Sequence, residues 1–572
     1  MKPYRNYPTE KFENLKLLYR AGAEKFGEKT LFKQKSNGAY HEFSFQRYAA
    51  DIDALGTALC ENGFAGKHII VMGENSYAWV TAYMAITCGV GVVVPLDKAL
   101  SADDFIKLAD FCEASGIIYS SSCADRVQAL PKEVKRICFD ELSTWVARGN
   151  QLLSEGCRSF LDAEIDADAM SILLFTSGTQ GTPKGVMLSH RNICFNLSEM
   201  CQMIDITPDD TFLSVLPLHH VYECTCSFLC SLYRGSCVAF TENLLLLTRN
   251  MREVSPTIIL CVPMLLETLY KKIWEYIRKH KLEKKVNSII RFTNALPTEK
   301  LRAAAKRKLF AKLHELFGGK LQMMISGGAM AEPKILRGLR DFGIYVYQGY
   351  GLTECAPLAA LNRDTYYLDN SAGMATPNTL LDAYDIQDDG IGEIRFKGAN
   401  VMLGYYRQPQ LTAEVIRGGW FYTGDFGYLD ENGFLFITGR KQNVIFNAQG
   451  KHIFPEELEA LLDKLPLVKE ALVVSYKDPK KENCDLVALI SPDTAQVMAK
   501  LGKNFTEAQL DLELKKSIAK LNATVQPYKR LSTHLIWKEE FPKNAAGKIK
   551  RMGIAEQAEA AYLAKIEQKQ AE

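Results

Sequence analysis

The chain has no window of 18 uninterrupted apolar residues, although 47% of its 572 residues are hydrophobic. A transmembrane helix needs about 20 predominantly apolar residues, so the sequence excludes an ordinary membrane-spanning helix. The first residues, Met-Lys-Pro-Tyr-Arg-Asn-Tyr, also lack the apolar core of a secretory signal. We therefore expect a cytoplasmic protein, and peripheral contact with a membrane stays open.

The chain also has little net charge and no regular cysteine spacing. The 69 lysines and arginines are offset by 67 aspartates and glutamates, so we expect no nucleic-acid partner. The 15 cysteines show no disulfide framework, which favours reduced thiols. Cys224, Cys226 and Cys230 lie close together, but their neighbours are apolar and no second Cys/His pair follows at zinc spacing. We predict buried core cysteines, and these features leave the oligomeric state undetermined.

The order of apolar and amphipathic stretches predicts the fold class. A chain of this length exceeds one hydrophobic core and should form at least two domains. Strand-like runs alternate with helix-like sequence through the first two-thirds of the chain, which predicts an α/β fold with largely parallel sheets. These runs are His68–Met72, Gly91–Pro95, Thr257–Val262 and Leu321–Ser326.

The last third of the chain changes in texture. From about residue 390, short strands and tight turns predict a β-rich subdomain, with a hairpin turn at Asp430–Gly433. We place the domain boundary at Gly439–Asn443, between a large domain of residues 1–439 and a small α+β domain of residues 440–572. The basic stretch Lys271–Lys285 predicts a surface helix rather than a nucleic-acid patch. The alanine-, glutamate- and lysine-rich tail from Ala555 predicts a solvated helix.

One loop carries the strongest chemical signal. Residues 175–185 read Phe-Thr-Ser-Gly-Thr-Gln-Gly-Thr-Pro-Lys-Gly and follow the apolar run Ser171–Phe175. Glycines let backbone N–H groups approach an anion, hydroxyls add donors, and a lysine supplies a point charge suited to phosphate. A proline precedes the lysine, so the spacing is not the Walker pattern. The segment predicts a phosphate-binding loop with the candidate residues Thr176, Ser177, Gly178, Thr179, Gly181 and Lys184.

Four further segments follow in order. Ser326-Gly327-Gly328-Ala329 ends an apolar run, and paired glycines there allow a flat aromatic ring to stack on bare backbone. Tyr347-Gln-Gly-Tyr-Gly-Leu-Thr-Glu354 comes about twenty residues later, and Tyr422-Thr-Gly-Asp425 ends in a carboxylate able to accept from two hydroxyls. Near the C-terminus the chain reads Pro542-Lys-Asn-Ala-Ala-Gly-Lys-Ile549.

In this order, the loop and the four segments resemble the adenylate-forming superfamily, which includes acyl-CoA synthetases, firefly luciferase and peptide-synthetase adenylation domains. The resemblance covers nearly the whole chain and implies that the small C-terminal domain is mobile. It also implies ATP and Mg²⁺ as cofactors, with Glu354 and Thr179 holding the metal. The nucleotide would contact the phosphate loop, Gly327, Gly328 and Tyr350 at adenine, Thr353 at the α-phosphate, and Asp425 at the ribose. Arg440 would support the ribose or the phosphate.

The same resemblance implies roles for two residues near the C-terminus. Lys548 would enter the active site during adenylation and neutralise charge that grows as a carboxylate attacks the α-phosphate. Gly450 would let the pantetheine of coenzyme A pass, because it has no side chain. The boundary departs from the family pattern, since Gln442 stands where many relatives carry a lysine or aspartate hinge. A hinge residue needs only to absorb a backbone rotation, so glutamine need not abolish turnover.

The segment Leu216-Pro-Leu-His-His-Val-Tyr-Glu223 bears on the substrate. It resembles the pattern of long-chain acyl-CoA synthetases, which implies that His220 positions or gates the fatty acid and that His219 is structural. The implied function is an ATP-dependent acyl-CoA synthetase for a long- or medium-chain fatty acid, with fatty acid, ATP and coenzyme A as its partners. Three alternatives stay open: an acyl-AMP ligase that loads a carrier protein, an aryl-CoA ligase, and a non-catalytic nucleotide-binding homologue.

Overall fold

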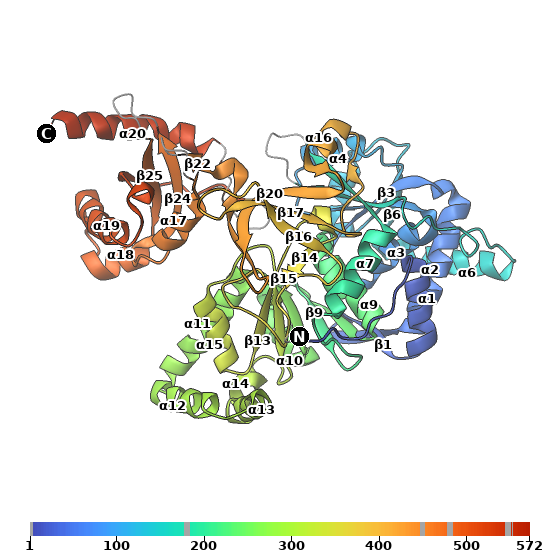
Figure 1. Ribbon diagram of the computed structural model, residues 1–572. Helices are drawn as coiled ribbons and strands as arrows, with labels where there is room; N and C mark the ends of the chain where they lie inside the picture. The colour runs from blue at the N-terminus through green and yellow to red at the C-terminus, as the bar shows by residue number, and fades with distance from the viewer. Residues whose placement is uncertain are drawn as a thin grey trace. The chain divides into compact units, whose positions relative to one another are not determined.

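The computed structural model describes residues 4–176, 183–446, 452–476, 484–543, 549, 551 and 553–571, without the side chains of Phe446 and residues 566–571. The chain divides into two compact units (Figure 1). Unit 1 comprises residues 1–382, 395–422 and 429–436, and unit 2 comprises residues 383–394, 423–428 and 437–572.

The larger sheet of unit 1 has nine strands, and its central six are parallel. Antiparallel strands close both of its edges. Its strands, in spatial order, are β15 (Met374–Ala375), β14 (Leu358–Leu361), β13 (Tyr345–Gly351), β12 (Met323–Ser326), β11 (Ile258–Cys261), β9 (Thr211–Ser214), β10 (Cys237–Phe240), β1 (Thr30–Ser36) and β2 (Ala39–Ser44).

The second sheet of unit 1 has seven strands and is likewise mainly parallel. An antiparallel pair, β8 and β18, forms one edge. The strands, in spatial order, are β18 (Gly404–Tyr405), β8 (Lys184–Ser189), β7 (Met170–Thr176), β4 (Gly91–Leu96), β3 (Lys67–Met72), β5 (Gly116–Tyr119) and β6 (Lys135–Cys138). The predicted runs at residues 68–72, 91–95, 171–175, 257–262 and 321–326 are therefore strands, and the α/β prediction is confirmed.

Alternating side chains show how the two sheets share a core. On β3, Ile69 and Val71 lie in the largest apolar cluster, whereas Ile70 belongs to a second cluster with Phe105 of α4 (Ala102–Phe111). On β11, Ile258 lies in the largest cluster and Ile259 faces a third. Because side chains alternate across a strand, both faces of each sheet are buried.

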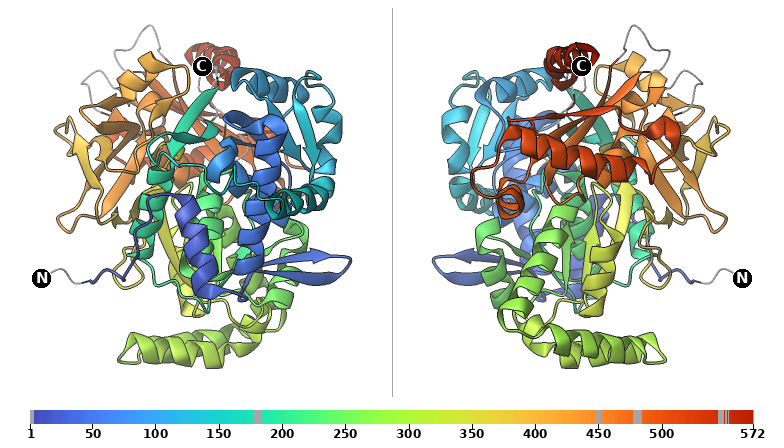
Figure 2. Two further views of the ribbon diagram at one scale, coloured as in Figure 1. Left: turned by 90° about the vertical axis from the view of Figure 1, so that its right-hand side faces the viewer. Right: turned by 90° about the vertical axis from the view of Figure 1, so that its left-hand side faces the viewer.

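Helices fill the layers on either side of the sheets (Figure 1). The shared layer contains α1 (Leu15–Phe26), α2 (Phe45–Leu59), α3 (Tyr77–Ala85) and α7 (His190–Cys201). The outer face of the nine-stranded sheet is covered by α10 (Leu247–Val254), α11 (Pro263–Lys279) and α15 (Pro333–Asp341). From α11 the chain continues through α12 (Glu283–Asn294), α13 (Glu299–Leu309) and α14 (Ala311–Glu315). Helices α12 and α13 lie at the lower edge of both views in Figure 2. The prediction of helix for the basic stretch is confirmed, with a break at residues 280–282.

A strand-rich region follows, as predicted. Its sheet contains β16 (Leu380–Tyr384), β17 (Gly392–Lys397), β20 (Trp420–Leu429) and β19 (Ile416–Arg417), and β21 (Leu435–Arg440) pairs with β20. The predicted turn at residues 430–433 joins β20 to β21. Its Gly433 amide donates to the Asp430 carbonyl at 3.0 Å, and Gly433 takes a φ of 83°. That positive φ is readily available to glycine.

Unit 2 contains a small α+β core. Strands β24 (Val468–Tyr476), β25 (Asp485–Pro492) and β26 (Thr533–Ile536) form a sheet. Helices α17 (Pro455–Leu462) and α19 (Glu507–Asn522) pack on one face, and α20 (Ile554–Ala571) packs on the other. The predicted tail helix is confirmed, but it is not solvated on every side, because Ile554, Ala558 and Tyr562 are buried. Their i, i+4, i+8 spacing places them on one helical face.

Two expectations from composition can be set beside the fold. Cys224, Cys226 and Cys230 are buried in the shared core, as predicted. Among the residues that the structure describes, no helix combines the length and the apolar character needed to cross a bilayer.

Candidate functional site

The phosphate-loop segment forms the open end of a β-hairpin. Strands β7 and β8 pair antiparallel, with Thr176 opposite Lys184 and Phe175 opposite Gly185. Both Thr176 and Lys184 are half-buried at the strand ends. The predicted residues between them, namely Ser177, Gly178, Thr179 and Gly181, lie outside the described residues.

Tyr405 connects this hairpin to the predicted magnesium ligand. Strand β18 pairs with β8, with Tyr405 opposite Val186. The Lys184 Nζ lies 5.4 Å from the centroid of the Tyr405 ring, within the range of a cation–π contact. The Tyr405 hydroxyl donates to Glu354 Oε1 at 2.8 Å. Tyr405 therefore contacts a cation through its ring and a carboxylate through its hydroxyl.

Glu354 is held by a short turn after β13. One 3-10 turn spans Thr353–Cys355, and the Glu354 carbonyl accepts from the Met402 amide at 2.9 Å. A Cβ at Gly351 would lie 1.8 Å from the Pro357 carbonyl oxygen, so only glycine fits there. Tyr350, Thr353 and Glu354 thus follow one another at the end of β13, all half-buried.

The paired glycines occupy the same edge of the nine-stranded sheet. Strands β12 and β13 are parallel neighbours with Ser326 opposite Gln348, so Gly327 and Gly328 leave the sheet beside the end of β13. Gly328 is exposed, with a φ of 82°. Gly327 is buried, and a Cβ there would lie 3.0 Å from the ring of Tyr222.

Tyr222 ties the paired glycines to the histidine segment. Its hydroxyl donates to the Ile325 carbonyl at 2.9 Å, one residue before Ser326. His219 and His220 precede it, with their ring centroids 4.2 Å apart. Burial lowers the pKa of His219 to about 3, and loss of surrounding water lowers the pKa of His220. At pH 7 both imidazoles are therefore neutral, which suits contact with an apolar substrate better than proton transfer.

Asn75 fixes the approach to these histidines. Its Nδ2 donates to Ser214 Oγ at 2.9 Å and to the Leu216 carbonyl at 2.7 Å, and its Oδ1 accepts from the Leu218 amide at 3.0 Å. Neither Asn75 nor Tyr405 was predicted from the sequence. The only signal for Asn75 is a polar residue shortly after a predicted strand, and Tyr405 stands in no periodic pattern.

In unit 2 the structure brings together Asp425, the predicted ribose ligand, and Arg440, predicted to support the ribose or the phosphate. Arg440 Nε lies 2.7 Å from Asp425 Oδ1, and the Asp425 side chain is only 5% exposed. The turn is built by its own neighbours, because the Thr423 hydroxyl accepts from the Asp425 amide and donates to the Ile394 carbonyl. Gly424 takes a φ of 68°. The other two predicted residues of this part of the chain, Gly450 and Lys548, lie outside the described residues.

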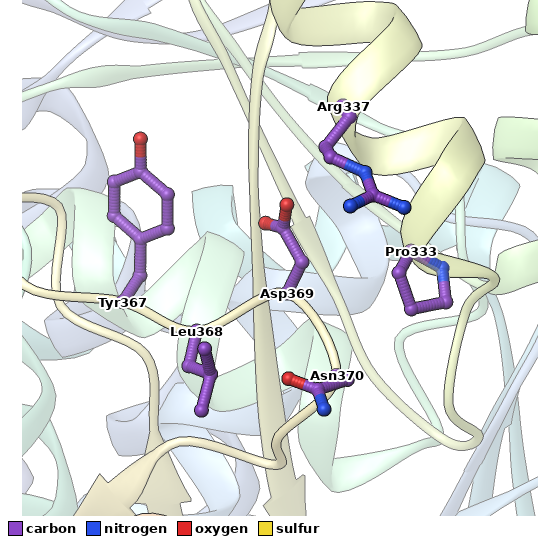
Figure 3. A pocket seen from close by; sticks show the side chains of 6 residues that line it. All are labelled: Pro333, Arg337, Tyr367, Leu368, Asp369 and Asn370. Carbon is purple, nitrogen blue, oxygen red and sulfur yellow. The ribbon is translucent and has the colours of Figure 1, made fainter.

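A separate cavity of about 440 Å³ lies beside α15 (Figure 3). Close to it, Arg340 pairs with Asp369 at 2.5 Å and stacks 4.4 Å from the Tyr367 ring centroid. None of the predicted site residues lines it, so we assign it no part in the chemistry. Its lining residues are Pro333, Arg337, Tyr367, Leu368, Asp369 and Asn370.

Comparison with known proteins decides the family. The family model described as AMP-binding enzyme matches residues 19–406. The chain belongs to the AMP-binding enzyme family. The predicted family is thereby confirmed, and the match contains every described site residue except Asp425 and Arg440.

Curated relatives of this AMP-binding enzyme include fatty acid ligases. It is 27% identical over 544 residues to the human "Long-chain-fatty-acid--CoA ligase 1", covering 85% of this chain and 75% of that protein. It is 27% identical over 565 residues to "Fatty acyl-CoA synthetase A" of Dictyostelium discoideum, covering 90% and 82%.

Solved structures share the fold. A fatty acyl CoA synthetase of Mycobacterium tuberculosis aligns with a TM-score of 0.67 at 22% identity, covering 96% of this chain and 99% of that one. The o-succinylbenzoate CoA synthetase of Bacillus subtilis, in complex with its acyl-adenylate intermediate, aligns with a TM-score of 0.71 at 22% identity, covering 94% and 97%. These similarities show the adenylate-forming fold for this chain.

Proposed function

We propose that this AMP-binding enzyme is an ATP-dependent acyl-CoA synthetase for a long- or medium-chain fatty acid. The observation that carries the proposal is the contact of Tyr405 with both Lys184 and Glu354. A lysine suits phosphate and a carboxylate suits a hard cation, so the pair matches the two charges of a magnesium triphosphate. The names of the curated relatives support the choice of acid.

The first half-reaction forms acyl-AMP and releases pyrophosphate. The loop between Thr176 and Lys184 holds the phosphates, and Thr353 contacts the α-phosphate. Adenine stacks on Tyr350 beside Gly327 and Gly328, and the ribose hydroxyls bind Asp425 with support from Arg440. We assign to Lys548 the neutralisation of the negative charge that grows as the carboxylate attacks the α-phosphate.

The residues present fit Mg²⁺. Glu354 is half-buried, and one of its oxygens already accepts from Tyr405, which orients the carboxylate. Mg²⁺ is commonly held by one or two carboxylates together with substrate phosphates rather than by a complete protein cage. When bound, the metal offsets the charge of the triphosphate, and we assign Glu354 and Thr179 as its protein ligands.

The second half-reaction forms the thioester. The C-terminal domain of residues 440–572 rotates about Gln442, which withdraws Lys548 and brings Gly450 to the acyl-AMP. The thiolate of coenzyme A attacks the acyl carbon, and AMP leaves with the electron pair of the broken bond. Activation is needed because a free carboxylate is a poor electrophile.

The neutral pair His219 and His220 supports an apolar acid. We propose that His220 positions or gates the chain of the acid, and that Tyr222 and Asn75 keep the histidine segment next to the paired glycines. His220 transfers no proton, because a fatty acid carboxylate needs no general base.

AMP release tests the function directly. It is measured with MgATP and acetate, octanoate, hexadecanoate or benzoate, each with and without coenzyme A. We expect turnover that depends on coenzyme A and peaks at the longer chains. Acyl-AMP that accumulates regardless of coenzyme A would identify a carrier-loading ligase, and a maximum with benzoate would identify an aryl-CoA ligase. No turnover with any acid contradicts the fatty acid proposal.

A further inference from the structure

Positive charge is concentrated in one helical segment of unit 1, here called the arm and defined as residues 263–315. The arm contains 14 lysines and arginines and five glutamates, so it carries a formal charge of +9 in a chain whose total is +2. The rest of the chain is therefore negative. Figures 1 and 2 show α12 and α13 of the arm at the lower edge of unit 1.

The basic side chains of the arm face solvent. Eleven of the 14 are exposed, and within the described residues none of these eleven forms an ion pair. They are Lys271, Lys272, Arg278, Lys279, Lys281, Lys284, Lys285, Arg291, Lys300, Lys308 and Lys312. A folded surface usually intersperses both signs of charge, so this accumulation favours an anionic partner.

Large apolar side chains are interleaved with these charges. On α12, Phe292 is 59% exposed and lies seven residues after Lys285, hence on the same helical face. On α13, Leu301 is 52% exposed and lies seven residues before Lys308. The buried residues of this part of the arm are fewer, namely Val286 and Thr293 of α12, Lys306 of α13 and Phe310 directly after it. Each outward face thus mixes cations with one or two apolar groups.

We propose that the arm docks on the surface of an anionic lipid bilayer. Helices that lie in the bilayer interface combine lysine and arginine with exposed phenylalanine or leucine, as α12 and α13 do. A nucleic acid would be attracted by the lysines but gains nothing from an exposed leucine. Lysine is depleted in the cores of protein interfaces, which disfavours a protein partner. The inference does not rest on the proposed function, because docking needs no substrate.

Vesicle co-sedimentation tests the surface. We expect the full chain to bind phosphatidylcholine vesicles that contain phosphatidylserine, to bind poorly to pure phosphatidylcholine, and to be released by high salt. Each basic residue near such a membrane changes binding about five-fold, so K284Q/K285Q/R291Q should weaken it about a hundred-fold. Phe292→Ser should weaken binding while leaving its salt dependence intact.

The matched control removes the same charge elsewhere. Lys107, Lys132 and Lys503 are exposed, and K107Q/K132Q/K503Q should bind the vesicles like the unaltered protein. Melting temperatures establish that all variants fold. The proposal is overturned if the unaltered protein does not bind anionic vesicles, or if the control variant loses as much binding as the arm variant. It is also overturned if the full chain binds a single-stranded oligonucleotide through the arm but does not bind the vesicles.

Discussion

Tyr405 contacts a positive charge with its ring and a negative charge with its hydroxyl. Its ring lies 5.4 Å from the Lys184 ammonium, and its hydroxyl donates to Glu354 at 2.8 Å. Loss of the hydroxyl would free the carboxylate to turn while leaving the ring below the lysine. The two contacts of the tyrosine can therefore be separated experimentally.

We predict that Tyr405→Phe lowers kcat/KM for AMP release about ten-fold or more, because a hydrogen bond to a charged group contributes about 1.5–3 kcal/mol. The Mg²⁺ concentration for half-maximal rate should rise, since Glu354 is less well oriented. Tyr406→Phe is the control, because the Tyr406 hydroxyl donates to the exposed Glu113 side chain at 3.3 Å. A Tyr405→Phe rate within two-fold of the unaltered enzyme would remove Tyr405 from the site.

Glu223 makes the stability of the protein depend on pH. The side chain is fully buried, and loss of water raises its pKa from 4.5 to about 8, opposed in part by Ser214, Ser227 and the Leu216 backbone. Between these values the folded state holds a proton that the unfolded state has released. The free energy of unfolding therefore falls as pH rises through this range.

Glu223→Gln should abolish this decrease in the free energy of unfolding with rising pH. We expect its melting temperature to match the unaltered protein near about pH 5 and to exceed it increasingly toward about pH 8, because glutamine carries no charge to bury. The exposed Glu275→Gln should leave the pH profile unchanged. Parallel profiles for the unaltered protein and Glu223→Gln would show that Glu223 does not hold the extra proton.

Among the elements, α20 connects the C-terminal tail to the core of unit 2. Tyr562 is 1% exposed, its hydroxyl donates to Asp485 Oδ2 at 2.9 Å, and its ring stacks 4.6 Å from that of Tyr476. Tyr476 belongs to β24 and Asp485 to β25, so one side chain links the helix to two strands.

Tyr562→Ala should lower the free energy of unfolding of unit 2 by about 3 kcal/mol, through loss of burial and creation of a cavity. Hydrogen exchange of the β24 and β25 amides should accelerate accordingly. The neighbouring Leu563 is 47% exposed, so Leu563→Ala should change exchange little. Equal exchange in both variants would mean that α20 does not stabilise the sheet.

The strands were the most predictable elements, because continuous apolar runs such as residues 68–72 can be buried on both faces of a sheet. The order of glycine-rich turns also predicted which segments follow β7, β12 and β13. The burial of α20 was missed because its apolar face consists of three residues diluted by alanine and lysine. Asn75 and Tyr405 were missed because their partners are distant in the sequence and exist only after folding.

At the scale of the molecule, the two half-reactions of the proposed mechanism depend on different residues near the C-terminus. Lys548→Ala should slow acyl-AMP formation at least about 10²–10³-fold, the usual effect of losing one preorganised donor. Thioester formation from supplied acyl-AMP should be nearly unchanged. Gly450→Leu should show the reverse, because an added side chain obstructs pantetheine.

Lys543→Ala is the control for Lys548→Ala. It removes a lysine from the same segment, but Lys543 forms an ion pair with Glu470. Both half-reactions should continue in this variant. A Lys548→Ala enzyme that keeps full acyl-AMP formation, measured as pyrophosphate release in a single turnover, would contradict the role given to this lysine.

The two units differ in how many cysteine thiols become reactive when they unfold. Eleven of the 15 are buried, and all eleven lie in unit 1, whereas unit 2 contains only the half-buried Cys484. When the chain is treated with a thiol-alkylating reagent and weighed by mass spectrometry, it should therefore gain up to eleven labels when unit 1 unfolds. It should gain almost none when unit 2 unfolds. The native cysteines can thus assign each step of denaturation to one unit, without isotopes or an engineered probe.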